Sequence, residues 1–461
     1  MKAEVVICGA GIAGIAAAYH LSVHSGVRDV VIVDELPPLS LTSDKSTECY
    51  RNWWPGPGDA MVAMTNRSID ILERLAHESD NRFLLNRRGY LFATAEESRI
   101  ESMRAGARES CALGAGEFRE HGIGSSGADY IPAPTSGFEN LPDGADLICD
   151  QALIRKHFPY LNDATVAVVH ARRCGWLSAQ QLGMYMLEQA RANGARLIQA
   201  SVQAVDTTGG QVRSVRLATD DATETIFTNT FVNAAGPFFK KVGEMIGIAL
   251  PVFSESHVKL SFHDHRGAMS QDAPLIICND PVHLSWTEEE REALASAPEG
   301  RPLLAQFPAG VHGRPAGGDN VLLYWTLDAT RVEPVFPQTW DPAISEILLR
   351  GMSSMVPALS AYFDHLPQPF VDGGYYGKTE ENRPLIGPTP VAGAWLMGAF
   401  SGYCIMTACA AGELLSAHVS GAELPAYAPA FTLERYDRPD YLAAFAAYQA
   451  QFADCSGSGQ I

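Results

Sequence analysis

Basic residues are scarce in this chain. Its 461 residues include 34 Lys and Arg against 53 Asp and Glu, so the formal net charge is −19 at pH 7. Binding to nucleic acid or to anionic lipid needs clustered Lys and Arg, and we therefore expect neither partner. Long apolar runs are also missing: none reaches the ~18 residues from which a membrane-spanning helix is predicted. The apolar run from Val5 leads into a glycine motif rather than a cleavage site, so we expect a cytoplasmic protein without membrane insertion.

Disulfide and metal patterns are absent too. The nine cysteines are scattered without a CxxC pair, which is typical of free thiols in a reducing compartment. His263, Asp264 and His265 form a ligand-like run, but no third ligand follows at a suitable spacing. We therefore predict a polar strand or loop there and no metal site. Hydrophobic residues make up 46% of the chain, enough for a large core, and the length predicts two or three domains.

A glycine motif is present near the N-terminus, where the pattern predicts a strand, a helix and a second strand. The expected elements are residues 4–8, 12–23 and 30–33. Gly9 permits the tight turn after the first strand, Gly11 lets a pyrophosphate approach the backbone, and Gly14 allows close packing of helix and strand. Asp34 ends the second strand, where a carboxylate can bind ribose hydroxyls. The motif indicates a bound dinucleotide but does not choose FAD over NAD.

The rest of the chain mixes helical and strand-like patterns. Helices are expected at residues 182–190 and 404–419, and strands at 212–217, 225–232 and 321–327. Between residues 251 and 368 short strand-like runs and prolines predominate. This predicts an antiparallel sheet, and hence a second kind of domain.

Several segments, in the right order along most of the chain, resemble those of the D-amino-acid oxidase family. Glycine oxidase, sarcosine oxidase and D-arginine dehydrogenase belong to that family. The segment 375–388 resembles its flavin-crossing segment, and 398–403 its glycine-rich turn beside the flavin ring. Residues 233–237 resemble its Ala-Ala-Gly turn, and 175–177 its mid-chain strand-to-helix signature. The resemblance favours FAD as the dinucleotide.

The resemblance implies an α/β protein with two discontinuous domains. One is a Rossmann-type FAD-binding domain with a parallel sheet, and the other is a mostly antiparallel substrate domain. We assign residues 1–85, 150–245 and 370–440 to the first, 86–149 and 246–369 to the second, and 441–461 to a C-terminal helix and tail. The glycine motif and the resemblance together place these residues at FAD: Gly9, Gly11, Ile12, Ala13, Gly14, Asp34, Glu35, Ser46, Thr47, Ala235, Gly236, Arg383, Ser401, Gly402, Tyr403, Cys404, Ile405 and Met406. A helix N-terminus at Ser401 to Tyr403 would stabilise the negative charge of reduced flavin.

The chain departs from the family pattern at two places. Gly374 stands where monomeric sarcosine oxidases carry the cysteine that binds flavin covalently, so we expect dissociable FAD. Cys49 and Cys404 are candidate neighbours of the flavin, as free thiols. Met406 stands where the family often has a carboxylate-binding lysine, and no oxygen-activating lysine is evident around residues 322–325. The electron acceptor, O2 or another, therefore stays open.

The resemblance also provides candidates for the substrate pocket. Arg51 suits a carboxylate because its guanidinium is a bidentate donor, but it could equally pair with Glu48 or with an FAD phosphate. Trp53 and Trp54 either wall the pocket or pack in the core.

Four further residues have weaker claims to the site. Lys378 is a candidate for the flavin N5 region or a bound water, against a solvated loop position. Tyr376 and Tyr403 would flank the substrate. Arg383 is a second carboxylate anchor or part of a structural turn before Pro384.

These observations predict an FAD-dependent oxidoreductase that oxidises a C–N bond in an amine or amino acid, including secondary or N-substituted ones. Hydride leaves the substrate carbon for flavin N5 and an imine forms, so no catalytic triad is needed. Two alternatives stay open. A flavin-dependent monooxygenase shares the first 35 residues but usually has a Gly-Asp pair at the second flavin contact. An FAD subunit of a multi-component dehydrogenase has the same fold. The sequence does not indicate an oligomeric state.

Overall fold

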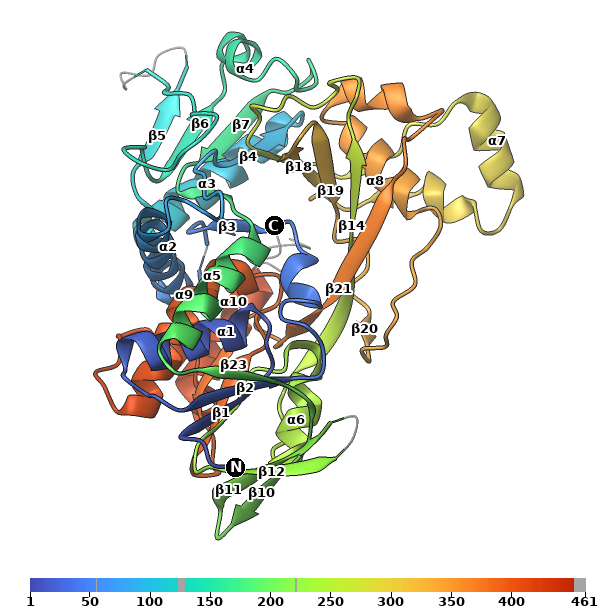
Figure 1. Cartoon of the computed structure of the whole chain (residues 1–461). Helices are drawn as coiled ribbons and strands as arrows, with labels where there is room; N and C mark the ends of the chain where they lie inside the picture. The colour runs from blue at the N-terminus through green and yellow to red at the C-terminus, as the bar shows by residue number, and fades with distance from the viewer. Residues whose placement is uncertain (55, 123–128, 220–221, 452–461) are drawn as a thin grey trace.

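The computed structural model describes residues 1–54, 56–122, 129–219 and 222–451. Two large sheets dominate these residues, the smaller one among helices and the larger one above it in the view of Figure 1. A three-stranded sheet and two pairs of short strands complete the strand structure of the described residues.

The smaller sheet has six strands in the order β22-β23-β13-β1-β2-β9. All neighbours are parallel except β22 and β23. The strands are β1 (Val5–Cys8), β2 (Val30–Asp34), β9 (Arg196–Gln199), β13 (Phe231–Asn233), β22 (Leu385–Pro388) and β23 (Ala394–Gly398). β1 and β2 are runs of Val and Ile, the composition of strands that are covered on both faces.

Helices cover one face of this sheet (Figure 1). They are α1 (Ile12–Tyr19, continued by a wider turn to His24), α2 (Ala60–Glu78), α5 (Ala179–Ala192) and α9 (Cys404–Ser420). α1 and α9 lie very close, because a Cβ on Gly412 would meet the Ala16 carbonyl at 2.7 Å. The opposite face packs against α6 (Phe239–Met245) and a small antiparallel sheet. That sheet consists of β10 (Ser201–Thr208), β11 (Gln211–Ala218) and β12 (Thr223–Phe227).

The larger sheet follows the order β20-β14-β19-β18-β15-β4-β7-β6-β5, and β21 pairs with β14. Its strands are β4 (Tyr90–Thr94), β5 (Phe118–His121), β6 (Ala145–Ile148), β7 (Ala167–Ala171), β14 (Phe253–His263), β15 (Leu275–Cys278), β18 (His312–Gly317), β19 (Asn320–Tyr324), β20 (Arg331–Val332) and β21 (Phe370–Lys378). Most neighbours are antiparallel, the exceptions being β4 with β15 and β5 with β6. The predicted α/β class with parallel and antiparallel sheets is therefore confirmed.

The remaining elements lie around this sheet and at the C-terminal end. The paired short strands are β3 (Cys49–Arg51) with β8 (Cys174–Trp176), and β16 (Val282–His283) with β17 (Gln306–Phe307). The other helices are α3 (Ile100–Ser110), α4 (Gln151–His157), α7 (Glu288–Ser296), α8 (Ile344–Ser353) and α10 (Pro439–Gln451).

The two faces of the larger sheet differ in chemistry. On β14 the buried residues Glu255, His257 and Lys259 share one face, whereas Leu260 and Phe262 point into an apolar core on the other. Successive strand residues point to opposite faces, so this alternation sets one polar and one apolar face. The polar face bears on the site described below.

The strand pairing departs from the sequence prediction at residues 225–232. The predicted single strand at residues 225–232 is wrong, because β12 and β13 belong to different sheets. The Thr228 hydroxyl donates to the Glu4 carbonyl at 3.1 Å in the turn between them. Two strands from segments that we assign to the cofactor domain belong to the larger sheet: β7 pairs with β4, and β21 pairs with β14. The domain boundaries themselves stay a prediction.

No helix of the described residues is long and apolar enough to cross a membrane. The cysteines within the described ranges are free thiols, and Cys455 lies outside them. The carboxylate of Asp264 accepts hydrogen bonds from the amides of Ala268 and Met269 and from the Tyr362 hydroxyl. Asp264 therefore shapes a turn after β14, in line with the predicted polar loop.

Candidate active site

The glycine turn between β1 and α1 is constrained by close backbone contacts. Gly9 has a φ of +113°, and a Cβ there would lie 2.3 Å from the Ala234 carbonyl oxygen. A Cβ on Gly14 would lie only 1.9 Å from the Gly9 carbonyl oxygen. Real Cβ atoms do not approach backbone so closely, so both positions require glycine.

Asp34, at the end of β2, holds this turn. Its carboxylate accepts hydrogen bonds from the Ala10 amide at 2.7 Å and the Leu36 amide at 2.9 Å. Burial raises the pKa of the Asp34 carboxyl above its ordinary value, although the two amides oppose the shift. The Ile12 amide donates to Ser43 Oγ at 3.0 Å, which ties the loop after β2 to the start of α1.

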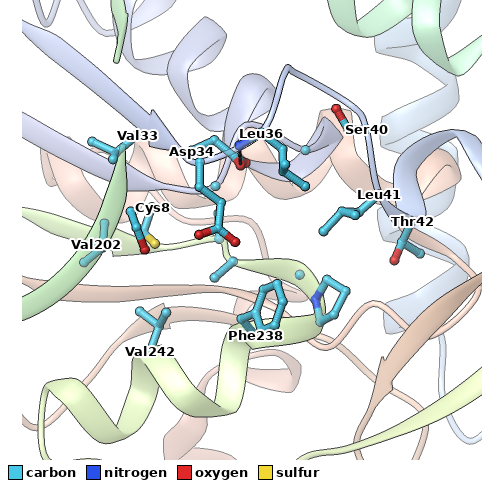
Figure 2. Close-up of a pocket in the computed structure, with 18 of the residues that line it drawn as sticks. Cys8, Val33, Asp34, Leu36, Ser40, Leu41, Thr42, Val202, Phe238 and Val242 are labelled. Carbon is cyan, nitrogen blue, oxygen red and sulfur yellow. Dashed lines mark hydrogen bonds between the residues drawn. The ribbon is translucent and has the colours of Figure 1, made fainter. Parts of the chain in front are cut away.

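A cleft of about 930 Å³ lies at the carboxyl ends of β1 and β2. We call it the strand-end cleft. Figure 2 shows Phe238 and Val242 on one side and Leu36, Ser40 and Leu41 on another. The sequence-predicted residues that line it are Gly9, Gly11, Asp34, Glu35, Ala235 and Gly236. Ligands of open α/β sheets bind at this position, outside the carboxyl ends of the strands.

The N-terminus of α9 offers unpaired backbone amides. No side chain caps it, so the amides of its first turn have no partner within the helix. The turn before it is tight: Ala399 and Ser401 have φ of +57° and +52°, and the Ser401 amide donates to the Gly377 carbonyl at 2.8 Å. A helix N-terminus of this kind favours negative charge.

A second cavity, of about 480 Å³, lies between this turn and the polar face of the larger sheet. We call it the aromatic cavity. It is lined by Ser46, Thr47, Cys49, Arg51, Tyr90, Leu275, His312, Tyr324, Tyr376, Gly402, Tyr403 and Met406. Four of these twelve residues are tyrosines, and the lining contains no Asp or Glu. Arg51 is therefore the one permanently charged side chain in the lining.

Arg51 is buried without an ionic partner. Its side chain is 2% exposed, and its Nε makes no hydrogen bond. The guanidinium carbon lies 5.4 Å from the Trp54 ring centre and 6.0 Å from that of Tyr403. Glu48, the candidate partner from the sequence, instead lies 3.6 Å from Arg314, and no ion pair of Arg51 occurs among the described residues. A buried charge is costly when unpaired, so this site is suited to an incoming anion.

The tyrosines of the aromatic cavity are neutral at physiological pH. Burial raises the pKa of Tyr376 to about 12 and raises the pKa values of Tyr90 and Tyr324 well above their ordinary value. Burial also raises the pKa of the Tyr403 hydroxyl, which accepts a hydrogen bond from the Asn382 amide at 2.7 Å. The walls thus present aromatic faces and hydroxyl groups rather than negative charge.

A buried ionic cluster lies behind Tyr376. The Glu255 carboxylate is 2.9 Å from Lys378 Nζ and 3.1 Å from His257 Nε2. The His257 ring stacks on Tyr376 with 4.2 Å between ring centres. Burial raises the pKa of Glu255, but hydrogen bonds from His257 and Lys378 outweigh it and hold the pKa below its ordinary value. The cluster fixes the wall of the cavity.

The family model described as FAD-dependent oxidoreductase, DAO, matches residues 4–418. The chain belongs to this family. Dimethylglycine dehydrogenase, mitochondrial, of Mus musculus is 25% identical over 443 residues, which are 92% of this chain and 43% of that protein. The chain thus spans less than half of the length of this relative.

Solved structures of the DAO family show the same fold. L-proline dehydrogenase from P. horikoshii superposes with a TM-score of 0.72 at 17% identity, covering 95% of this chain and 98% of the other. Glycine oxidase from Geobacillus kaustophilus superposes with a TM-score of 0.70 at 16% identity, covering 94% and 99%. The expected resemblance to the D-amino-acid oxidase family is therefore confirmed, as is FAD as the cofactor.

The structure fits FAD at the predicted places. Gly9 and Gly14 leave no room for a side chain where the α1 N-terminus would bind the pyrophosphate. Asp34 and Glu35 line the strand-end cleft where ribose hydroxyls would bind. The uncapped amides of Cys404, Ile405 and Met406 begin α9 beside the aromatic cavity, where they would stabilise a reduced flavin ring.

The aromatic cavity brings together a second group of the predicted residues. Its members are Ser46, Thr47, Arg51, Tyr376, Gly402, Tyr403 and Met406. Trp53 and Trp54 do not line it: Trp53 stacks on Phe92 at 5.6 Å, and Trp54 packs edge-on against Tyr403 at 4.5 Å.

Other predicted residues lie behind these cavities. Ile12, Ala13 and Gly14 are buried within α1. Lys378 lines neither the strand-end cleft nor the aromatic cavity and is paired with Glu255. Arg383 donates to the Pro57 carbonyl, and its guanidinium carbon lies 6.0 Å from the Tyr441 ring centre, so it joins three segments of the chain.

The sequence did not point to several residues of the aromatic cavity. Tyr90, Leu275, His312 and Tyr324 come from four strands of the larger sheet. Their convergence depends on register, in which His312 faces Tyr324 and Tyr90 faces Leu275. The polar alternation along β14 was the one local signal of the polar face of this sheet.

Proposed function

We propose that the chain oxidises the C–N bond of an amine that also carries a carboxylate, giving an imine. The substrate would be an amino acid or an N-substituted amino acid. The observation that carries the proposal is the buried, unpaired guanidinium of Arg51 in an aromatic cavity without Asp or Glu. An arginine of this kind binds a carboxylate through two hydrogen bonds and gains its missing counter-charge.

The walls of the cavity suit the amine end. Tyr90, Tyr324, Tyr376 and Tyr403 offer aromatic faces, which attract alkylammonium groups and accommodate N-alkyl substituents. Dimethylglycine, L-proline and glycine, after which the similar proteins are named, all combine a carboxylate with an amine. A carboxylate at Arg51 would fix one end of such a molecule, while the walls exclude water from the carbon that is oxidised.

FAD, bound non-covalently, supplies the hydride acceptor at N5. The chain contributes position and electrostatics: Arg51 holds the carboxylate, and the α9 amides favour the charge that develops on reduction. O2 or another acceptor then takes the electrons. We also propose that the predicted domain assignment holds, with the strand-end cleft in the cofactor domain and the strands of the larger sheet other than β7 and β21 in the substrate domain.

The test is the visible spectrum of the purified flavoprotein during anaerobic additions from a panel of amino acids, N-methyl amino acids, cyclic amino acids and simple amines. Bleaching by a carboxylate-bearing amine, but not by the matching amine without the carboxylate, is expected. Admitting air then separates an oxidase, which recovers its spectrum, from a dehydrogenase.

The control variant is Arg51→Lys, which keeps the charge but loses the bidentate geometry, and it should require a higher concentration of the same compound. A flavin that no amine bleaches but NADPH does would overturn the proposal in favour of a monooxygenase.

A further inference from the structure

His312 is the one side chain in the lining of the aromatic cavity with a basic nitrogen at neutral pH. It lies on β18, directly across from Tyr324 on β19 and Ile277 on β15. The side chain is 6% exposed, and its ring centre lies 4.9 Å from that of Tyr324. The register of β18 with β19 and β15 places His312 at this position.

The tautomer of His312 follows from its one hydrogen bond. Nδ1 lies 2.9 Å from the Gly310 carbonyl oxygen, which can only accept, so Nδ1 carries the proton. Nε2 then presents a lone pair. Among the described residues neither nitrogen of His312 takes part in an ion pair, and the residue lines the aromatic cavity.

The surroundings keep this imidazole neutral. Around it stand Arg51 and Cys49 on β3, Tyr90 on β4, Tyr324 on β19, Tyr376 on β21 and Tyr403 before α9. Burial raises the pKa of each of these tyrosines and of Cys49, so Arg51 is the charged neighbour. Burial and then the charge of Arg51 lower the pKa of His312 to about 4.

Oxidation of an amine needs a proton acceptor such as a neutral imidazole. An amino acid arrives with its nitrogen as ammonium, which has no lone pair to form the new C=N bond. The cavity lining offers no carboxylate, its tyrosines are protonated, and Lys378 lies outside it, paired with Glu255. A neutral imidazole within reach of the cavity is the remaining general base.

We propose that His312 Nε2 accepts the proton of the substrate ammonium before hydride transfer. The inference rests on the proposed function. The N–H bond breaks and its electron pair stays on the substrate nitrogen. The α C–H bond then breaks, its two electrons leave with the hydride to oxidised FAD, and the nitrogen lone pair forms the C=N bond. Imidazolium later releases the proton to solvent.

Substrate binding itself would prepare this base. A carboxylate at Arg51 neutralises the charge that helps to lower the pKa of His312. The pKa of the imidazole therefore rises in the complex, toward the range in which a base is effective. Arg51 and His312 would act on the two ends of one zwitterion.

The first experiment uses the compound that bleaches the flavin. The variant His312→Asn keeps a side-chain donor for the Gly310 carbonyl and removes Nε2. Its limiting rate of anaerobic flavin reduction should fall by about 100-fold or more at pH 7. Near pH 10 the free amine arrives already deprotonated, so the deficit should shrink to a few-fold. A deficit of the same size at both pH values would overturn the inference, since it would indicate a structural role.

The second experiment needs no turnover. Diethyl pyrocarbonate acylates neutral imidazole, and peptide mass spectrometry locates the label in the FAD-loaded protein. His312 should react nearly as well at pH 5.5 as at pH 7.5, whereas an ordinary histidine loses reactivity below ~6.5. The exposed His283 serves as the internal reference. No label on His312, or a loss parallel to that of His283, would overturn the inference.

The two experiments separate the inference from the proposed function. If no carboxylate-bearing amine reduces the flavin, the proposed function fails whatever His312 does. If such a compound reduces the flavin and Arg51→Lys weakens it, but His312→Asn leaves the pH profile unchanged, the proposed function stands and the base is not His312.

Discussion

The strand-end cleft is lined mainly by the segments that follow parallel strands β1, β2 and β13 and by α6, whereas the aromatic cavity is lined by residues from six strands, β3, β4, β15, β18, β19 and β21. The turn beside the first cavity requires the absence of side chains at Gly9, which lines the cleft, and at Gly14, which lies behind it. In the second, Arg51, Tyr376 and His312 must each present a particular group. A site of the first kind is destroyed by added atoms, and one of the second kind is altered residue by residue.

The largest effect should come from Gly14→Ala. Its new Cβ would lie 1.9 Å from the Gly9 carbonyl oxygen, so the turn and α1 must separate. We expect loss of bound flavin and of folded protein, measured as the ratio of flavin to protein absorbance and by thermal unfolding.

The matched control is Gly106→Ala in α3, where a Cβ meets nothing within 4 Å. It should stabilise the protein by about 0.5–1 kcal/mol, because alanine is the better helix former. Equal flavin content in both variants would refute the steric account of the turn.

Arg51→Met should separate stability from function. Removing an unpaired buried charge should raise the free energy of unfolding of the substrate-free protein, whereas the loss of a buried partner for carboxylate costs about 2–5 kcal/mol of binding. Apparent substrate affinity should therefore fall by roughly 30-fold or more. Denaturant unfolding and the reductive titration measure the two quantities.

Arg314→Met is the control for that variant. Arg314 is also buried, but it donates to the Thr47 carbonyl at 2.8 Å and faces Glu48 at 3.6 Å. Its loss should destabilise the protein. A similar fall in stability for both variants would mean that Arg51 is paired in solution.

Glu255→Gln should lower the free energy of unfolding by about 1–3 kcal/mol at pH 7, because Lys378 and His257 lose a charged acceptor. The pKa of Glu255 is below its ordinary value in the folded chain. Its contribution is therefore present above the unfolded pKa of ~4.3 and is lost as the pH falls through the lower folded pKa.

The difference in unfolding free energy between wild type and Glu255→Gln should thus shrink on acidification from pH 7 to pH 3.5. Glu380→Gln removes an exposed ion pair with Arg331 and should change stability by less than ~0.5 kcal/mol. A difference for Glu255→Gln that grows toward acid pH would contradict the assigned direction.

The smallest effect is expected from replacing Cys49 or Cys404, which should not change how the flavin is bound. Cys49 lines the aromatic cavity and Cys404 begins α9, and both are free thiols. If FAD is held without a covalent bond, acid precipitation releases all the flavin from wild type, Cys49→Ser and Cys404→Ser alike. Flavin that stays with the wild-type pellet but not with one variant would identify a covalent link.

The sequence was informative where the structure is local. Gly9, Gly14 and Asp34 fall within one strand-helix-strand unit, so spacing alone predicted the tight turn at Gly9 and the close packing at Gly14. The ribose contact expected of Asp34 stays a prediction, and the hydrogen bonds of its carboxylate to the Ala10 and Leu36 amides were not foreseen. Helix α9 and the buried strands β1 and β2 were predicted from local sequence for the same reason. The resemblance to the family added Arg51, Tyr376 and Tyr403, which line the aromatic cavity.

Long-range pairing set the limits of prediction. His312 and Tyr324 are brought to the cavity by the register of β18 and β19, and no short pattern marks either residue. The single strand predicted at residues 225–232 failed because Phe227 and Phe231, both apolar, belong to different sheets. The sequence likewise does not show that Glu48 pairs with Arg314 rather than Arg51, since β3 and β18 are far apart along the chain.

The order of strands in the smaller sheet has a consequence for synthesis on the ribosome. β1 and β2 emerge well before several of their neighbours, because β1 pairs with β13, β13 pairs with β23, and α1 packs against α9, which follows β23 in the chain. At translation rates of about 5–20 residues per second, these apolar strands wait roughly 20–80 seconds for their partners. The nascent segment that contains β1 and β2 is therefore a candidate for chaperone capture, and the FAD site can be completed only after α9 has been made.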